Sequence, residues 1–152
     1  MILRKTEDGK NGKSLIFDLP WPPSVNSYYR AIPRGKFATN IISKDGRTYK
    51  EKKIPEAMKK GNPKPEGWEG RIRMTVIAFP PDKRRRDLDN IQKPLWDALE
   101  EVGVYKDDAQ IDDYQVLRGE IVKGGRVMVE VEEVQDYSVI VLEDVISALS
   151  SK

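Results

Sequence analysis

The sequence predicts an α+β (mixed α/β) fold, a single domain with a mixed β-sheet and a few helices. Three observations lead to this prediction. Residues 71–79 alternate in the manner of a strand with one buried face. Apolar residues between 91 and 102 recur at helical spacing, and residues 114–134 return to strand patterns. A chain of 152 residues fits one domain with an ordinary core.

The N-terminal part begins with a polar, glycine-bearing stretch, residues 1–13, for which we expect a flexible conformation. A short apolar run at residues 14–19 predicts the first strand. Pro20 ends this run because proline cannot donate to a strand ladder. The expected folded domain therefore covers residues 14–134, and a C-terminal tail covers residues 135–152.

A loop with aromatic side chains and a cation is predicted at residues 26–30, Asn-Ser-Tyr-Tyr-Arg. Such a loop can contact nucleic acid by stacking on bases and by binding phosphate. Tyr29 and Arg30 are therefore candidate DNA-binding residues. An equally good interpretation is a loop that is packed by its own tyrosines.

The middle of the chain predicts a helix and a strand joined by a connector. Residues 43–60 carry helix formers, although Pro55 interrupts them and is expected to break or kink the helix. Residues 60–67, rich in glycine and proline, form the connector. The strand at 71–79 ends at two prolines and delivers the chain to a charged segment, and strand ends beside loops are where α/β sheets place their sites.

An amphipathic helix follows this charged segment. Its apolar stripe consists of Ile91, Leu95, Ala98, Leu99 and Val102. Gly103 occupies the position of a glycine that ends a helix. Pro94 remains unexplained, because it lies just beyond the first turn if Asp89 or Asn90 is the N-cap, and only the first turn tolerates proline.

The last third of the chain predicts two strands and a helical tail. Residues 114–122 and 126–134 flank Lys123-Gly124-Gly125, a turn signal that predicts a β-hairpin. In the second strand valines alternate with polar residues, so one face is expected to be wet. The tail is expected to form a short amphipathic helix with Leu142, Val145, Ile146 and Leu149 at helical spacing.

The composition excludes several classes of site. Without cysteine the chain forms no disulfides, thiol nucleophiles or thiolate zinc sites, and without histidine it has no imidazole base. The net charge is only +2, so any attraction for a polyanion must come from local clusters of cations. No signal peptide or long apolar span is visible, and we expect a cytoplasmic protein that does not associate with membranes.

Residues 83–113 carry the pattern that is most informative about function. They open with four consecutive cations, Lys83, Arg84, Arg85 and Arg86. The carboxylates Asp87 and Asp89 follow directly, although carboxylates repel the polyanion that a basic run attracts. A divalent metal reconciles the two, because Mg²⁺ is commonly held by one or two carboxylates and a substrate phosphate. The segment therefore predicts a metal-dependent phosphodiester site with the four cations bound to DNA.

The spacing within this segment allows a more ordinary interpretation as well. On an extended segment Asp87 and Asp89 would point to the same side, and Lys93 would share a helix face with Asp89. A helix that begins with acidic caps and one ion pair would show the same residues. The adjacent basic run favours the metal site, since four cations need a polyanion or many carboxylates.

A second acidic pair is needed to complete such a site. Asp107-Asp108 lies between the predicted helix and the next strand and can return to the same sheet edge. Asp112-Asp113 can serve instead, and spacing does not choose between the pairs. Either pair is also compatible with a solvated turn.

Several motifs occur in a fixed order over residues 15–133. They are Leu19-Pro20-Trp21-Pro22-Pro23-Ser24, Asn26, Tyr28-Tyr29-Arg30, Arg84-Arg85-Arg86-Asp87-Leu88-Asp89-Asn90, Gln92-Lys93, Asp97-Ala98-Leu99, Asp107-Asp108-Ala109-Gln110, Asp113-Tyr114 and Lys123-Gly124-Gly125-Arg126. Together they resemble the RusA family of Holliday-junction resolvases, endonucleases of bacteria and their prophages. Three features depart from the family pattern: Pro94, Ala31-Ile32-Pro33 in the basic loop after Tyr29-Arg30, and the tail after Glu133.

The resemblance implies a homodimer of mixed α/β fold that binds four-way DNA junctions and nicks two strands symmetrically. The metal-binding carboxylates of the family fall on Asp87, Asp89 and Asp108. Its catalytic lysine falls on Lys93, and an arginine implicated in DNA contact falls on Arg86. The resemblance thus favours Asp108 over Asp112, and it implies Mg²⁺ as the cofactor, with Mn²⁺ as a substitute.

We therefore expect a Mg²⁺-dependent endodeoxyribonuclease that resolves Holliday junctions in DNA recombination and repair. Without histidine, a carboxylate, a lysine or a metal would have to activate water, and a metal does so at neutral pH. Lys93 and the metal would neutralise the developing charge. Two alternatives remain: a nuclease that acts on other branched DNA, and a junction-binding protein without catalysis whose acids only cap a helix.

Overall fold

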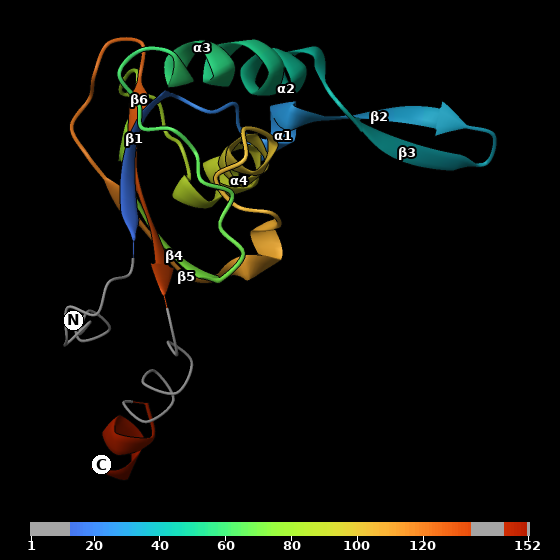
Figure 1. The fold of residues 1–152 in the computed structure, drawn as a ribbon. Coiled ribbons are helices and arrows are strands. Elements are labelled where there is room, and N and C mark those ends of the chain that lie inside the picture. The colour runs from blue at the N-terminus through green and yellow to red at the C-terminus, as the bar shows by residue number, and fades with distance from the viewer. Residues whose placement is uncertain (1–12, 135–144, 152) are drawn as a thin grey trace.

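A four-stranded mixed sheet forms the centre of the computed structural model, which describes residues 13–134 and 145–151 (Figure 1). The strands in sheet order are β1 (Ser14–Pro20), β6 (Arg126–Val134), β4 (Arg71–Phe79) and β5 (Ile111–Arg118). β6 is antiparallel to both of its neighbours, whereas β4 and β5 are parallel. The prediction of an α+β fold with a mixed sheet is confirmed.

The inner face of the sheet supplies the core. On β4 the predicted alternation is confirmed, because Ile72, Met74, Val76 and Ala78 are all at most 1% exposed. The three alternate valines of β6 are equally buried. Side chains of this kind contribute about 1.5–3 kcal/mol each when fully buried. The burial of one face of β4 therefore stabilises it as an inner strand, between β6 and β5.

The segment after residue 43 is helical, as predicted, but it is not uniform. It comprises α2 (Lys44–Thr48), η1 (Tyr49–Lys53) and α3 (Ile54–Met58), and Figure 1 shows these elements along one end of the sheet. In η1 the Ile54 N–H donates to the carbonyl of Tyr49, five residues earlier, which defines a π-turn. Pro55 accounts for this turn, because its ring clashes with the carbonyl four residues earlier in a regular α-helix.

The second helical region explains Pro94. A 3₁₀ turn, η2 (Leu88–Ile91), precedes α4 (Gln92–Glu101), so the α-helix begins later than Asp89 or Asn90 would have placed it. Pro94 is the third residue of α4. The N–H groups of a first turn have no acceptor within the helix, and a proline there removes no hydrogen bond.

The predicted hairpin of residues 114–122 and 126–134 is wrong. β5 and β6 do not pair with each other, because β4 lies between them. The connection from β5 to β6 crosses the end of β4, where the N–H groups of Gly119 and Val122 donate to the carbonyls of Ala78 and Pro80 at 2.8 and 2.9 Å. The glycine pair still turns the chain, but a turn signal specifies only a local reversal and not the strand partner.

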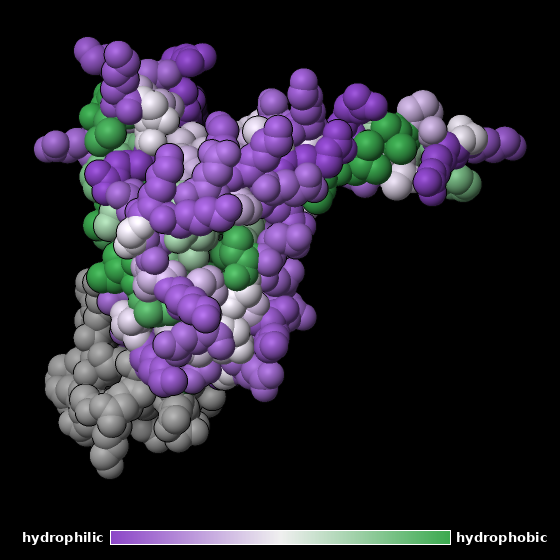
Figure 2. Space-filling view, turned by 45° about the horizontal axis from the view of Figure 1, so that its top comes forward, coloured by the Kyte–Doolittle hydropathy of each residue, from purple (hydrophilic) through white to green (hydrophobic). Residues whose placement is uncertain are grey.

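A hairpin occurs where the sequence had predicted a loop. After the helical turn α1 (Val25–Tyr28), β2 (Tyr29–Arg34) pairs antiparallel with β3 (Phe37–Ile42). Figures 1 and 2 show that this hairpin projects away from the sheet. Tyr28 is buried at the base of the hairpin, which excludes it from contacting DNA, whereas Arg30 is exposed.

Residues 145–150 are helical, and Val145, Ile146 and Leu149 are exposed. Leu142, the remaining member of the predicted apolar stripe, lies outside the described residues, as do residues 1–12, where a flexible start was expected. Within the described parts of the chain, no helix is long and apolar enough to cross a membrane.

The position of Pro94 leads to a prediction about stability. Pro94→Ala should lower the free energy of unfolding by no more than about 2 kcal/mol, the contribution of buried ring carbons and of a stiffer unfolded chain. Ala98→Pro, in the interior of the same helix, should cost at least about 3 kcal/mol. Urea unfolding followed by circular dichroism measures both. Equal losses for the two variants would contradict the assigned start of α4.

Candidate active site

Lys93 connects α4 to the turn η3 (Asp108–Gln110) that follows it. Its Nζ lies 2.7 Å from Oδ1 of Asp97 and 2.8 Å from Oδ2 of Asp108, in η3. The expected pairing of Lys93 with Asp89 is wrong. Asp89 lies in the 3₁₀ turn η2, so the spacing of four residues does not place it on the same helix face as Lys93.

The surroundings of Lys93 keep it protonated. Partial burial alone would lower its pKa, but the hydrogen bonds and charges of Asp108 and Asp97 outweigh this effect and raise the pKa above its ordinary value. A lysine with a raised pKa cannot accept a proton at neutral pH. Lys93 is therefore a fixed positive charge and not a general base.

A buried tyrosine supports this ion-pair network. The Tyr28 hydroxyl donates to Oδ2 of Asp97 at 3.1 Å. Burial, and then the charge of Asp97, raise the pKa of Tyr28, so the hydroxyl remains a donor. The sequence pattern had suggested no role for Asp97, although its spacing of four residues from Lys93 is a usable signal. No local pattern identifies Tyr28, which comes from a distant segment.

A group of three carboxylates lies beside Lys93. Oxygen atoms of Glu100, Asp107 and Asp108 lie within 4.8 Å of one another. Glu100 accepts a hydrogen bond from the Asp108 N–H at 2.9 Å, and Asp107 accepts one from the Ala109 N–H at 2.8 Å. Oxygen donors alone suit a hard divalent cation such as Mg²⁺. Glu100 had not been recognised from the sequence.

Asp87 and Asp89 do not lie on one extended segment, contrary to the prediction. Asp87 is extended and immediately precedes η2 without a capping hydrogen bond from its side chain, whereas Asp89 lies within this turn. Both are exposed, and their carboxylates have no hydrogen bond or ion pair to other described residues. Within the described chain the three-carboxylate group includes neither. Asp108 is thus common to the predicted ligands and to the group found in the structure.

The other acidic pair is engaged elsewhere. Asp112 accepts a hydrogen bond from Nε of Arg71 at 2.7 Å, and Asp113 accepts one from Nε of Arg73 at 3.0 Å. The hydrogen bond from Arg71 lowers the pKa of Asp112. Both arginines belong to β4, so this pair links the two parallel strands.

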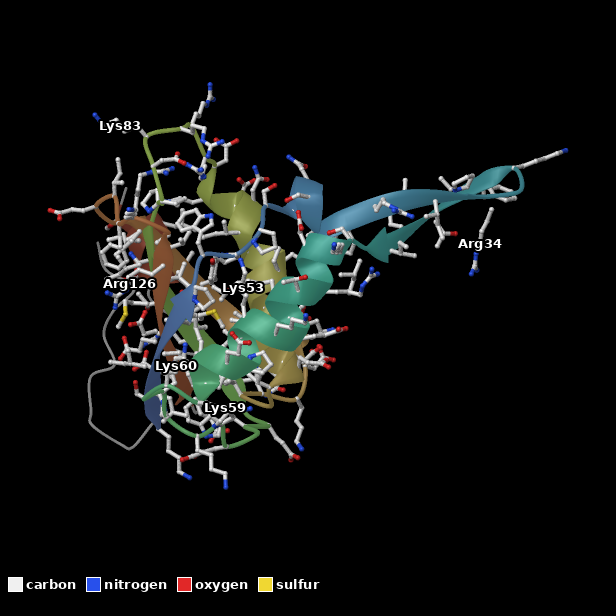
Figure 3. All side chains as sticks on the ribbon, turned by 90° about the horizontal axis from the view of Figure 1, so that it is seen from above. Arg34, Lys53, Lys59, Lys60, Lys83 and Arg126 are labelled. Atoms are coloured by element: carbon white, nitrogen blue, oxygen red, sulfur yellow. The ribbon has the colours of Figure 1, made fainter. Side chains whose placement is uncertain are left out.

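The basic run is organised by an aspartate that precedes it. Asp82 accepts hydrogen bonds from the guanidinium groups of Arg86, at 2.6 Å, and Arg84, at 2.9 Å. These two arginines hold the pKa of Asp82 well below its usual range, Arg86 most of all. In the described chain Lys83 and Arg85 are exposed and form no ion pair. Figure 3 shows Lys83 pointing outward from this loop.

An open groove of about 680 Å³ brings two of the sequence motifs together. One wall is the segment from Trp21 to Ser27, and the other comprises Arg84–Asp87 with Asn90 and Ile91. Gly125 supports the first wall, because a Cβ there would lie 2.8 Å from Cβ of Trp21. The groove therefore has basic side chains and the carboxylate of Asp87 on the same wall.

Comparisons with known proteins show the family to which the chain belongs. The family model described as endodeoxyribonuclease RusA matches residues 20–132. The crossover junction endodeoxyribonuclease RusA of Enterobacteria phage 82 is 40% identical over 115 residues, which cover 76% of this chain and 91% of the phage protein. The protein of that name from Enterobacteria phage HK97 is 42% identical over 121 residues, or 78% and 94% of the two chains. The protein from Escherichia coli K12 is 39% identical over 118 residues, with coverage of 76% and 91%. The chain belongs to the RusA family of endodeoxyribonucleases, which confirms the resemblance seen in its motifs.

Proposed function

We propose that this protein is a metal-dependent endodeoxyribonuclease that resolves four-way DNA junctions by paired, symmetric nicks. The observation that carries the proposal is the ammonium group of Lys93, held between Asp97 and Asp108 beside further carboxylates. A separate groove lined by the basic run, after the end of β4, suits a DNA backbone. The names of the relatives, crossover junction endodeoxyribonucleases, supply the substrate class.

The residues of the chain divide the chemical task between them. A divalent cation, when bound by the carboxylates, supplies Lewis acidity and neutralises charge on the phosphate. Lys93 adds a preorganised positive charge for the phosphorane-like transition state. Asp97 and Tyr28 hold Lys93 in place. We propose Mg²⁺ as the natural ion, with Mn²⁺ as a substitute, since every candidate ligand is an oxygen.

The active form is proposed to be a homodimer. Two nicks at symmetry-related positions need two equivalent sites, and a twofold dimer provides one site on each protomer. The site of action follows from the substrate, and we infer that the protein works on DNA in the cytoplasm. Arg86 and Arg84 line the groove, and with Arg85 and Lys83 they are the proposed phosphate contacts. Tyr29 and Arg30 are proposed to extend this DNA-binding surface to the root of the hairpin.

The direct test uses labelled branched DNA. Wild-type protein is incubated with a four-way junction, a three-way junction, a flap and a linear duplex of the same sequence, with and without Mg²⁺. We expect paired nicks in opposite strands of the four-way junction, only with Mg²⁺, and an intact duplex. Preferential cleavage of the three-way junction or flap would favour a different branched substrate. Binding without cleavage in any metal would favour a non-catalytic protein.

The metal ligands can be identified by three substitutions of equal size. Asp108→Asn should abolish cleavage, whichever carboxylates share the ion with Asp108. If the resemblance places the ligands correctly, Asp89→Asn should also abolish cleavage and Asp107→Asn should not. All three proteins should still bind a junction in metal-free buffer, because a lost carboxylate reduces repulsion of the phosphate. Full activity of Asp89→Asn with an inactive Asp107→Asn would assign the ion to the group of Glu100, Asp107 and Asp108 instead.

Lys93 gives a second prediction. Lys93→Ala should reduce single-turnover cleavage by about 10²–10³-fold, the cost of losing one preorganised electrostatic partner. Lys93→Arg should recover little, because a planar guanidinium places its charge differently. Each exposed ion pair is worth only about 0–1 kcal/mol, so the melting temperature should change little. Lys59→Ala is the matched control, because Lys59 follows α3 and not the helix of Lys93 (Figure 3). Cleavage by Lys93→Ala within a few-fold of wild type would restrict Lys93 to a structural role.

Asp82 competes with phosphate for two arginines. Asp82→Asn should therefore tighten binding to linear duplex and steepen the dependence of log affinity on log salt, by about 0.9 for each additional phosphate that the freed arginines neutralise. Glu120→Gln removes the same charge from an exposed position and is the control. Fluorescence anisotropy at several salt concentrations measures both. Weaker binding by Asp82→Asn would show that Asp82 holds the arginines in their binding positions.

A further inference from the structure

The β2–β3 hairpin has two chemically different faces. Side chains of residues paired in an antiparallel ladder, and those two positions apart, lie on the same face. One face of the hairpin, called here the cationic face, carries Arg30, Ile32, Arg34, Phe37, Thr39 and Ile41. The opposite face carries uncharged residues along the strands, namely Ala31, Pro33, Ala38 and Asn40. The two faces of the hairpin therefore differ in charge, and residues on both of them are exposed.

The charge of this hairpin has one sign. No acidic residue occurs between Asp18 and Asp45, although the chain contains 25 aspartates and glutamates. Within the described chain Arg30, Arg34 and Lys36 form no ion pair. Figure 3 shows the Arg34 side chain extending from one side of the ribbon. Cations without a protein partner on a projecting ribbon are suited to bind phosphates.

The tip of the hairpin carries an exposed aromatic ring. Phe37 is 81% exposed, the largest value among the exposed large hydrophobic residues of the described chain. Gly35, with φ of +60°, allows the tight turn that places Phe37 opposite Arg34. In Figure 2 the hairpin shows hydrophobic surface next to hydrophilic surface. A phenylalanine this exposed gains nothing from packing within its own chain.

We propose that the hairpin is a DNA-probing arm, with Arg30 and Arg34 on the backbone and Phe37 stacked on a base at the branch point. The proposal rests on the proposed function, since it assumes branched DNA as the substrate. At a branch point bases are more easily unstacked than within a duplex, and an aromatic side chain can then stack on one or wedge into the step. The arm would thus contribute recognition of the branch, separately from the catalytic carboxylates.

The same hairpin of a second copy fits this surface less well. If two hairpins paired by their cationic faces about a twofold axis, each arginine would approach the same set of cations on the other hairpin. The hairpin contains no acid to neutralise them. Like charges so placed oppose association, whereas a DNA backbone removes the repulsion. The charge pattern therefore favours nucleic acid as the occupant.

The test compares a junction with a linear duplex of the same sequence in metal-free buffer. Phe37→Ala should weaken binding to the four-way junction by about tenfold while changing duplex affinity by less than about twofold. Phe37→Trp should retain junction binding. Asn40→Ala, on the opposite face of the same hairpin, is the matched control. A 2-aminopurine base at the branch should change its fluorescence with wild type but not with Phe37→Ala, and one in the middle of an arm should not respond.

Each outcome distinguishes the hairpin proposal from the proposed function. If wild type binds and cleaves junctions but Phe37→Ala binds them equally well, the arm is not a branch probe. If Phe37→Ala converts a dimer into monomers in analytical ultracentrifugation, the hairpin contacts a second copy and the proposal is wrong. If wild type itself shows no preference for junctions over duplex, the proposed function fails together with the inference.

Discussion

The parallel pairing of β4 and β5 is the constraint on which the rest of the structure depends. Two parallel neighbours cannot be joined by a tight turn, so the chain must cross over from the end of β4 to the start of β5. The charged segment, η2, α4 and η3 make up this crossover. The basic run thus leaves one end of β4, and Asp108 returns just before β5 begins at the other end. Lys93 lies on the helix between them, and its ion pair with Asp108 links this helix to the turn before β5.

Sequence patterns predicted the structure correctly where the pattern was local. They failed where a partner strand or a distant residue determined the structure. Alternation in β4 and β6 and the apolar stripe of α4 correctly predicted the elements and the core. The partner of β6 was predicted wrongly, because a glycine turn does not reveal that β4 lies between β5 and β6. The hairpin of β2 and β3 was missed because it projects from the body, so its residues do not alternate between buried and exposed positions.

The candidate active site shows the same difference between local patterns and tertiary contacts. The motif order identified the family, and the structure places the basic run along a groove and Asp108 in an ion pair with Lys93. The partner of Lys93 was predicted wrongly, since a 3₁₀ turn before α4 changes which side chains face one another. Tyr28 reaches the site from a distant element, whereas Glu100 lies on the same helix as Lys93 and meets Asp107 and Asp108 only in the tertiary structure. Asp82 had no predicted role, yet it binds two of the four cations of the basic run.

The central claim is that a divalent cation binds at Asp108 beside Lys93. The most direct measurement is a crystal structure with Mn²⁺, in which anomalous scattering identifies the ion independently of the protein density. We expect an anomalous peak with Asp108 as one ligand and the ammonium group of Lys93 nearby, and no such peak in crystals of Asp108→Asn. A peak bound only by other carboxylates, or one that persists unchanged in Asp108→Asn, would contradict the claim.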